Sequence, residues 1–284
     1  MQVREMNIRN KNHFRIDYDI TRACNNRCPY CCENSYLDNS LKFNPYVFEQ
    51  VINAVNSYDV PGKLSVSLLG GDPLLQPHHV KEFVERIDAD VTVFSNLNYS
   101  PQSKHIQLVK DLKCKFINSW HDVSNVEFVK ENLLIMKGKV QPILMIRPEN
   151  INDMLKHSHW LIDSNIKYGV QFIRDELDTV QMDISDVRVQ EIFENAQKTT
   201  ENTIDDETFN AVESLRADLL NIATRHKVLC RLYQCRIKFD GNIETLCTNS
   251  VDYGHIKDGL KFKEIMCSGN HCLCDTSNYK RILV

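Results

Sequence analysis

The sequence predicts an α/β fold in which helices cover a largely parallel sheet. The first observation is an alternation of strand-like and helix-like hydrophobic patterns, repeated six times between residues 14 and 173. The second is size and composition: 284 residues, 42% hydrophobic and 25% charged, fit one large globular domain or a domain with a small appendage. Alternation of this kind favours a parallel sheet. Periodicity alone leaves open whether the sheet closes partly into a barrel or stays open and doubly wound.

The predicted elements follow one another along the chain. Residues 14–20 alternate apolar and polar side chains, as a strand does. Asn44 before Pro45 is typical of a helix start, and Ser124-Asn125-Val126-Glu127 reads as a capping box for a later helix. Further strands are predicted over 64–69, 91–94, 115–118, 140–146 and 168–173, and helices around 45–55, 80–87, 101–112, 126–136 and 151–164.

Beyond these units the composition changes. Residues 175–207 are acidic and polar, which predicts a loop and a solvated helix, and 209–222 predict an amphipathic helix. A boundary near residue 225 would separate a core domain, 1–225, from a cysteine-rich extension, 226–284. No apolar run approaches the ~18 residues that span a bilayer, and the start lacks the apolar core of a signal peptide. We therefore expect a cytoplasmic protein without membrane contact.

Eleven cysteines stand out in this ordinary composition. In a reducing cytoplasm they indicate metal binding or catalysis rather than structural disulfides. Cys114 is isolated, and the others form an N-terminal group of four and a group of six between Cys230 and Cys274. Two separate groups predict two metal sites.

The N-terminal group spaces three thiols as C-x3-C-x2-C, directly after the first predicted strand. Cys24, Cys28 and Cys31 could hold three irons of a 4Fe–4S cluster and leave the fourth iron without a protein ligand. An open coordination position is what catalysis at a metal requires. On spacing alone, a zinc knuckle remains the alternative.

These residues carry a family resemblance. The loop, with Tyr30 at the aromatic position, resembles the C-x3-C-x-aromatic-C motif of the radical S-adenosylmethionine (SAM) superfamily. Gly70-Gly71-Asp72-Pro73 after the second strand is similar to that family's Gly-Gly-Glu-Pro motif, with Asp in place of Glu. Ser95-Asn96 ends the third strand, where many members carry a Thr-Asn or Ser-Asn pair. The resemblance covers about residues 14–175 and implies a partial (β/α)6 TIM-like barrel with a small cysteine-rich C-terminal extension.

The resemblance also implies the chemistry. The open iron would be chelated by SAM, and an electron from an external reductant such as flavodoxin or ferredoxin would cleave SAM to methionine and a 5′-deoxyadenosyl radical. That radical would abstract hydrogen from a C–H bond of a peptide or small molecule. Tyr30 would pack against the adenine, and Ser95 and Asn96 would lie near the ribose. The methionine part of SAM would be lined by Gly70, Gly71, Asp72 and Pro73.

The C-terminal cysteines surround a predicted hairpin that turns at Asp240-Gly241-Asn242 and ends at Cys247. This stretch resembles the start of SPASM and twitch extensions, which hold auxiliary iron–sulfur clusters. It departs from their pattern, because five residues instead of four separate Gly241 from Cys247 and the downstream cysteine run is absent. One second 4Fe–4S cluster is expected, with a structural zinc site as the alternative. Its expected ligands are Cys247, Cys267, Cys272 and Cys274, with Cys230 or Cys235 as substitutes.

Two further residues are candidates for catalysis. His121 follows the fourth predicted strand and Arg147 the fifth, on the expected rim of the site, where they could transfer protons or bind substrate; a surface role is equally compatible with the sequence. His78 and His79 are expected to be solvated. Because 23 residues precede Cys24, a peptide substrate would require a separate recognition protein.

Two other functions remain open. The same core could modify a nucleotide or nucleic-acid base, although a net charge of −4 gives no global attraction to nucleic acid. Alternatively, the chain could be a non-catalytic zinc or iron–sulfur protein that acts in binding or electron transfer, in which case it would not cleave SAM.

Overall fold

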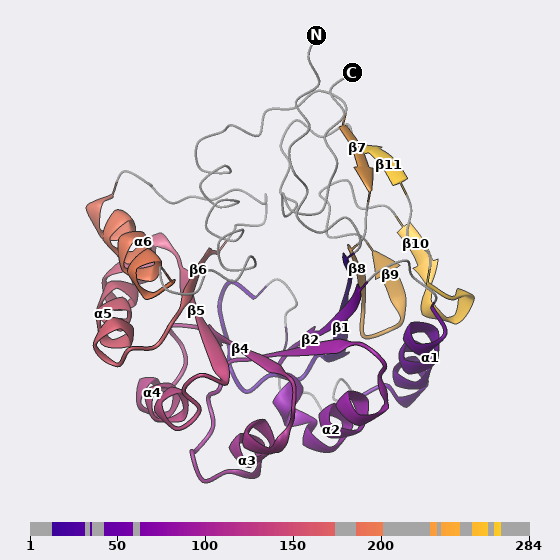
Figure 1. Ribbon diagram of the computed structural model, residues 1–284, viewed down its shortest axis with the longest axis horizontal. Coiled ribbons are helices and arrows are strands. Elements are labelled where there is room, and N and C mark those ends of the chain that lie inside the picture. Colours follow the sequence, from indigo (N-terminus) through magenta and orange to yellow (C-terminus); the bar gives the residue numbers. More distant parts are fainter. Residues whose placement is uncertain are drawn as a thin grey trace.

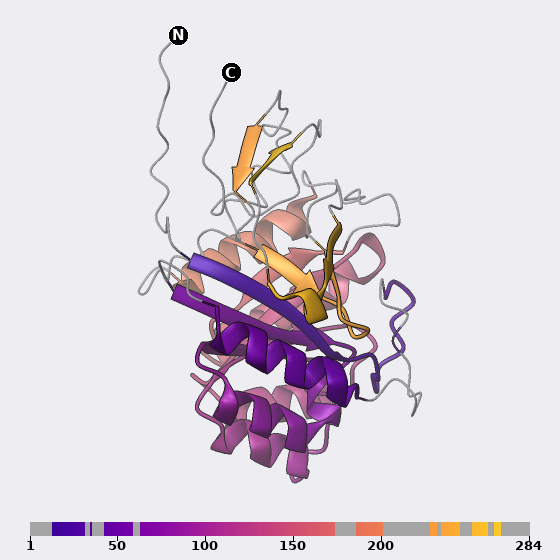
Figure 2. The same ribbon diagram turned by 90° about the vertical axis from the view of Figure 1, so that its right-hand side faces the viewer.

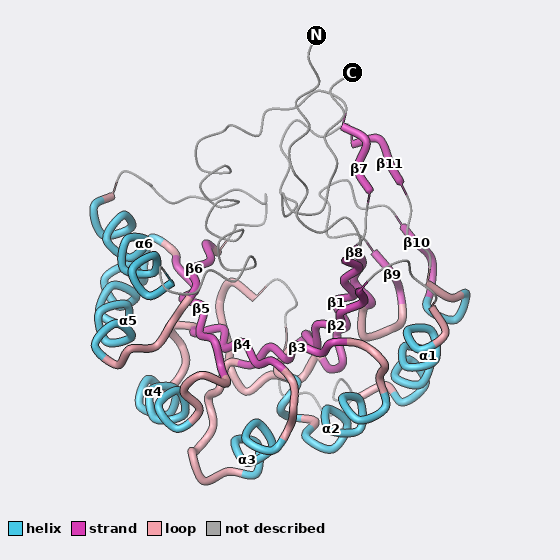
Figure 3. Tube along the Cα trace, viewed as in Figure 1, coloured by secondary structure: helices cyan, strands magenta, loops and turns pink. Residues whose placement is uncertain are grey.

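The computed structural model describes residues 13–31, 35, 43–58, 63–173, 186–200, 228–231, 234–244, 252–260 and 264–267. Their main element is a nine-stranded sheet in the order β10-β9-β8-β1-β2-β3-β4-β5-β6. The sheet curves into an open arc with helices α1 to α5 along its outer side (Figures 1 and 3). The predicted α/β class is confirmed, and the unclosed arc agrees with a partial TIM-like barrel.

Neighbouring strands from β1 to β6 are parallel, as the alternating pattern predicted. The strands of this series are β1 (His13–Thr21), β2 (Lys63–Gly70), β3 (Asp90–Ser95), β4 (Lys115–Trp120), β5 (Val140–Ile146) and β6 (Gly169–Phe172). The helices are α1 (Pro45–Asn56), α2 (Pro77–Arg86), α3 (Lys104–Asp111), α4 (Val126–Ile135), α5 (Ile151–Asp163) and α6 (Val187–Thr200). In the view turned by 90°, α1 lies beneath β1 and β2 (Figure 2).

The side chains of strand β1 alternate between the two faces of the sheet. Its even-numbered residues are buried on the helix side, where the ring of Tyr18 lies 5.8 Å from that of Phe83 of α2. Its odd-numbered residues, including Asp17 and Asp19, lie on the concave face, because successive side chains of a strand point to opposite sides. The alternation that predicted this strand therefore leaves polar side chains on the concave face.

The C-terminal strands complete the sheet on the other side of β1. Strand β8 (Gln234–Ile237) pairs in parallel with β1, and β9 (Asn242–Glu244) and β10 (Asp252–His255) follow in antiparallel order. The guanidinium of Arg236 donates to both carboxylate oxygens of Asp19 over 2.9–3.1 Å, which ties β8 to β1. The predicted hairpin is confirmed, with Gly241 at its turn at φ +92°. The expected boundary near residue 225 lies outside the described residues.

Some local predictions were wrong. Asn125, not Ser124, caps α4, since its Oδ1 accepts from the backbone N–H groups of Glu127 and Phe128, whereas Ser124 Oγ accepts from Asn26. Of the two histidines that were expected to be solvated, His78 is exposed, whereas His79 is partly buried and its ring stacks on Phe43 with centroids 3.4 Å apart.

Helix α6 also differs from its prediction, because one side of it is buried. Val189, Ile192 and Ala196 belong to the core, and the backbone carbonyl of Ile192 accepts a hydrogen bond from the Tyr168 hydroxyl. The amphipathic helix predicted over 209–222 lies outside the described residues. Among the helices that the structure describes, none is long and apolar enough to cross a membrane.

His157 makes the stability of this core pH-dependent. Its ring stacks on Trp120 with centroids 4.4 Å apart, and burial, followed by the charge of Lys130, lowers its pKa to about 4. An unfolded histidine titrates near pH 6.5. Because the unfolded chain binds this proton first, stability is full above pH 6.5 and decreases as the pH falls from 6.5 to 4. We expect a loss of about 3 kcal/mol in the free energy of unfolding from this residue over that interval.

The measurement is urea unfolding at pH 7 and pH 4.5 of the wild type and of His157→Phe, which keeps an aromatic ring and removes the titration. The variant should lose less stability than the wild type. His78→Gln, at an exposed position of α2, is the matched control and should lose as much stability as the wild type. An equal loss in His157→Phe and the wild type would contradict the assignment.

Candidate active site

The loop that follows β1 carries the three N-terminal thiols. Cys24, Cys28 and Cys31 are half-buried and unbridged, and the N–H of Cys31 donates to the carbonyl of Cys28 at 3.1 Å, which closes a turn between the last two. Burial raises the pKa of Cys24 to about 12, with a contribution from Asp72, and that of Cys28 to about 11, with a contribution from Cys31. Burial thus disfavours the thiolate forms of Cys24 and Cys28, and a bound cationic metal that replaces their protons would stabilise these forms.

The donor set fits a 4Fe–4S cluster with one open iron. Three half-buried thiols from one short loop could each bind a different iron of such a cluster. Among the described residues, no three His, Cys, Asp or Glu side chains converge on one point where a single metal ion could bind.

The glycines of the Gly70-Gly71-Asp72-Pro73 loop bring it against the cysteine loop. The N–H of Gly71 donates to the carbonyl of Thr21, and that of Asp72 to the carbonyl of Ala23, both at 2.8 Å. A Cβ on Gly70 would lie 1.9 Å from the Thr21 oxygen, and one on Gly71 2.0 Å from the Ala23 oxygen. The close approach that requires glycine is therefore an approach to the chain's own backbone.

Asp72 connects the ends of β2 and β3. Its fully buried carboxylate accepts from the Ser95 hydroxyl at 3.0 and 3.1 Å and from the N–H groups of Asn96 and Leu74 at 2.9 and 3.0 Å. Burial raises the pKa of Asp72 to about 6, although these hydrogen bonds oppose the shift. Asp72 and Ser95, which the sequence placed beside SAM, bind one another here.

A network of asparagines holds the cysteine loop to its neighbours. Asn96 Nδ2 donates to Asn25 Oδ1 and Asn98 Nδ2 to Asn26 Oδ1, both at 2.7 Å, and Asn25 Nδ2 donates to the carbonyl of Asn98 at 2.8 Å. We call Asn25, Asn26, Asn96 and Asn98 the asparagine clamp. The turn of the clamp contains Leu97 at φ 51°, an uncommon conformation for a non-glycine residue.

Only Asn96 of the clamp was singled out in the sequence. Asparagine is common in loops, so the other three gave no specific signal beyond their positions after strands β1 and β3. The clamp cross-links two strand ends that parallel pairing had already brought to one edge of the sheet.

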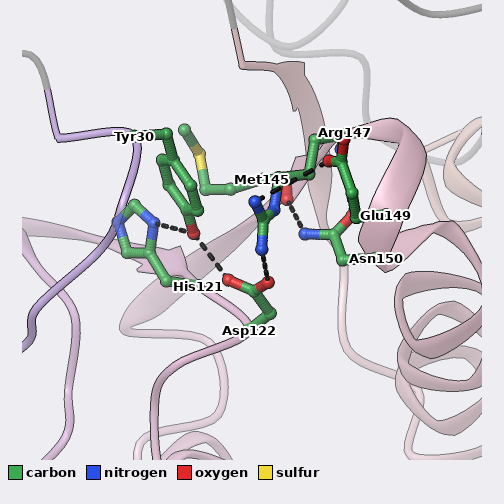
Figure 4. A network of polar contacts seen from close by, with 7 residues as sticks. All are labelled: Tyr30, His121, Asp122, Met145, Arg147, Glu149 and Asn150. Carbon is green, nitrogen blue, oxygen red and sulfur yellow. Dashed lines mark hydrogen bonds and ion pairs between the residues drawn. The ribbon is translucent and has the colours of Figure 1, made fainter.

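A second network joins Tyr30 to the ends of β4 and β5 (Figure 4). The Tyr30 hydroxyl donates to Asp122 Oδ1 at 2.7 Å, and Arg147 Nη2 donates to Asp122 Oδ2 at 2.5 Å. The guanidinium carbon of Arg147 lies 4.6 Å from the centroid of the Tyr30 ring, within cation–π range. His121 Nδ1 lies 3.2 Å from the phenol oxygen. Since the phenol hydrogen is given to Asp122, this oxygen accepts from His121 Nδ1–H.

The charges of this network follow from its contacts. Burial lowers the pKa of His121 to about 4, so its imidazole is neutral at pH 7. Burial would raise the pKa of Asp122, but hydrogen bonds from Arg147 and Tyr30 outweigh it and hold the pKa below its usual value. Burial, together with the bond to Asp122, raises the pKa of Tyr30, which keeps the phenol protonated. The structure thus brings together Tyr30, His121 and Arg147 around Asp122, a residue that sequence reasoning missed although it adjoins His121.

The C-terminal cysteines are only partly described. Cys230 lies on β7 (Val228–Arg231) and Cys267 on β11 (Glu264–Cys267), two strands that pair in antiparallel order. Cys235 is buried in the hydrophobic core on β8, opposite Ile16 of β1. The remaining expected ligands, Cys247, Cys272 and Cys274, lie outside the described residues.

Comparisons with known proteins agree on the class of fold. The family model of the radical SAM superfamily matches residues 18–212. No curated protein sequence matches the chain. The structure of anSMEcpe with bound AdoMet is similar at a TM-score of 0.60 and 13% identity, over 87% of this chain and 78% of that one. SuiB of Streptococcus suis, bound to precursor peptide SuiA, is similar at a TM-score of 0.56 and 14% identity, over 88% of this chain and 64% of SuiB.

Proposed function

Since the chain belongs to the radical SAM superfamily, we propose that this enzyme reductively cleaves SAM and uses the resulting 5′-deoxyadenosyl radical to abstract hydrogen from a C–H bond of its substrate. One observation carries the proposal. The C-x3-C-x2-C loop sits at the carboxyl end of β1, among loops that follow β2, β3 and β4. Parallel α/β proteins place their active sites at this edge.

The proposed roles of the residues follow from their positions. Cys24, Cys28 and Cys31 would hold a 4Fe–4S cluster, which supplies the electron for SAM cleavage when bound. The Gly70-Gly71-Asp72-Pro73 loop and Ser95-Asn96 would line the SAM site, with Asp72 and Ser95 fixing the shape of both loops through their mutual hydrogen bonds. Tyr30 would contact the adenine with its ring. Its hydroxyl already donates to Asp122, so the ring is the part of the side chain that is left for SAM.

Arg147 and His121 are proposed to act on the substrate or on SAM. Arg147 Nε is buried and has no hydrogen-bond partner in the part of the chain that the structure describes, so it offers a donor to an anionic group. The neutral imidazole of His121 could bind substrate or accept a proton. Its low pKa, about 4, would make it a weak base.

A peptide is the substrate class that the comparisons support. SuiB is bound to the precursor peptide SuiA, and anSMEcpe with AdoMet is bound to a Kp18Cys peptide. A small molecule remains the alternative within the proposal. An external one-electron reductant such as flavodoxin or ferredoxin, and a separate peptide-recognition protein, would complete the system.

We also propose that residues 226–284 hold one auxiliary 4Fe–4S cluster of the SPASM or twitch type. The hairpin of β8 and β9 supports this, because β9 ends at Glu244, shortly before Cys247. The proposed ligands are Cys247, Cys267, Cys272 and Cys274, with Cys230 as a substitute. Cys235 is left out, because a core position between strands suits a buried apolar side chain.

Iron analysis and SAM cleavage test both parts. After anaerobic reconstitution with iron and sulfide, we expect about eight irons per chain, as two 4Fe–4S clusters require. Addition of dithionite and SAM is expected to produce 5′-deoxyadenosine. About four irons with activity would refute the auxiliary cluster and leave the C-terminal cysteines to zinc or structure. Bound zinc without SAM cleavage would refute the proposed reaction.

A further inference from the structure

The side-chain amide of Asn96 has a defined orientation. Asn96 Oδ1 lies 2.8 Å from the backbone nitrogen of Asn98, and a backbone N–H can only donate. This contact assigns the oxygen and places the amide nitrogen on the other side. There, Asn96 Nδ2 donates one N–H to Asn25 Oδ1 at 2.7 Å and lies 3.7 Å from Cys24 Sγ. Two anchors thus direct the remaining N–H at the sulfur.

Cys24 Sγ has a second donor on its own loop. The backbone N–H of Asn26 lies 3.4 Å from the sulfur. Both donors are fixed, one by the loop backbone and the other by the clamp, and Asn96 is itself only 6% exposed. An N–H dipole directed at a sulfur in a poorly hydrated site interacts more strongly than it would in water.

We propose that Asn96 is a positioning residue that raises the reduction potential of the cluster bound through Cys24, by donating its side-chain N–H to the cysteine sulfur. The proposal rests on the proposed function, since it requires a 4Fe–4S cluster at this loop. One-electron reduction adds a negative charge to the cluster, so the positive end of an N–H dipole stabilises the reduced state more than the oxidised state. Hydrogen bonds to the sulfurs are among the features that set the potential of such clusters. The sequence had placed Asn96 beside the SAM ribose.

The midpoint potential tests this role directly. The full chain, reconstituted without SAM, is poised at a series of potentials, and the reduced cluster is quantified by electron paramagnetic resonance (EPR). Asn96→Leu, which removes the donor at similar size, should lower the midpoint potential. Asn96→Asp should lower it further, because it keeps the acceptor for the Asn98 N–H, loses the donor and adds a negative charge.

Asn195→Leu is the matched control. Asn195 is also 6% exposed, and its side-chain N–H donates to Ser158 Oγ at 3.1 Å, so the substitution removes a buried amide donor outside the cysteine loop and the clamp. Its midpoint potential should equal that of the wild type. A wild-type potential in Asn96→Leu, or an equal shift in Asn195→Leu, would overturn the proposal.

A measurement on the wild type covers the case in which the Asn96 variants bind no cluster. With 15N in the asparagine side-chain amides, pulsed EPR of the reduced protein should show a weak 15N coupling to the cluster, and its absence would overturn the role of Asn96. A wild type that binds no cluster at all would instead refute the proposed function, and this inference with it.

Discussion

Single replacement of Cys24, Cys28 or Cys31 by Ala is expected to reduce 5′-deoxyadenosine formation to background, while the fold persists. Each thiolate would hold one iron, so removal of any one should release the cluster or leave it unable to bind SAM. The fold should persist because the bonds that place this loop, from Gly71 N to the Thr21 carbonyl and from Asp72 N to the Ala23 carbonyl, use backbone atoms. Iron content, 5′-deoxyadenosine yield and thermal unfolding are measured for each variant.

Cys114→Ala is the control for these replacements. Cys114 is also half-buried and unbridged, but it lies between α3 and β4, apart from the cysteine loop in the sequence. It should retain the iron content and activity of the wild type. Activity that survives in any of the three loop variants would remove that cysteine from the proposed ligand set.

Gly71→Ala is expected to destabilise the protein and to prevent cluster binding. Its Cβ would lie 2.0 Å from the Ala23 oxygen, so the two loops would have to separate and lose their two backbone hydrogen bonds. Overpacking costs about 1–3 kcal/mol and each lost hydrogen bond about 1 kcal/mol, which gives a loss of about 3–5 kcal/mol in the free energy of unfolding. Denaturant unfolding and iron content measure the two effects.

Gly138→Ala separates steric overlap from the general cost of replacing glycine. Gly138 has φ +83°, but a Cβ there would meet no atom within 4 Å. Its variant should lose only about 1–2 kcal/mol, the cost of a left-handed conformation, and should bind iron normally. If Gly71→Ala loses no more stability than Gly138→Ala, then the close approach of the loops is not what requires glycine at position 71.

The fold and the edge that carries the site could be predicted because they depend on local patterns. Alternation in residues 14–20 defines a strand, and carboxyl ends of parallel strands share one edge, so Cys24, Gly70 and Ser95 were expected to lie together. Their hydrogen bonds could not be predicted. That Asp72 binds Ser95 rather than a ligand depends on its complete burial, which no local pattern encodes.

Contacts between residues that are distant in the sequence could not be predicted either. Asp122 joins Tyr30 to Arg147 because three strand ends meet, and a lone aspartate after a strand gives no sign of this. Likewise, the sequence predicted the hairpin at Gly241 but not its position beside β1. Loop propensity and hydrophobic period describe single segments, whereas such contacts depend on where the whole chain places them.

The parallel pairing of β1 with β8 affects how the protein is made. In the part of the chain that the structure describes, one edge of β1 pairs with β8 alone, and residues 234–237 emerge from the ribosome more than 200 residues after β1 itself. A chain truncated before β8 would keep that edge exposed, with Asp19 deprived of Arg236, and exposed edges promote aggregation. After deletion of the whole C-terminal region, an effect of the missing cysteines could therefore not be distinguished from misfolding of the nascent core. Single cysteine substitutions avoid this problem and are the better test of the C-terminal cysteines.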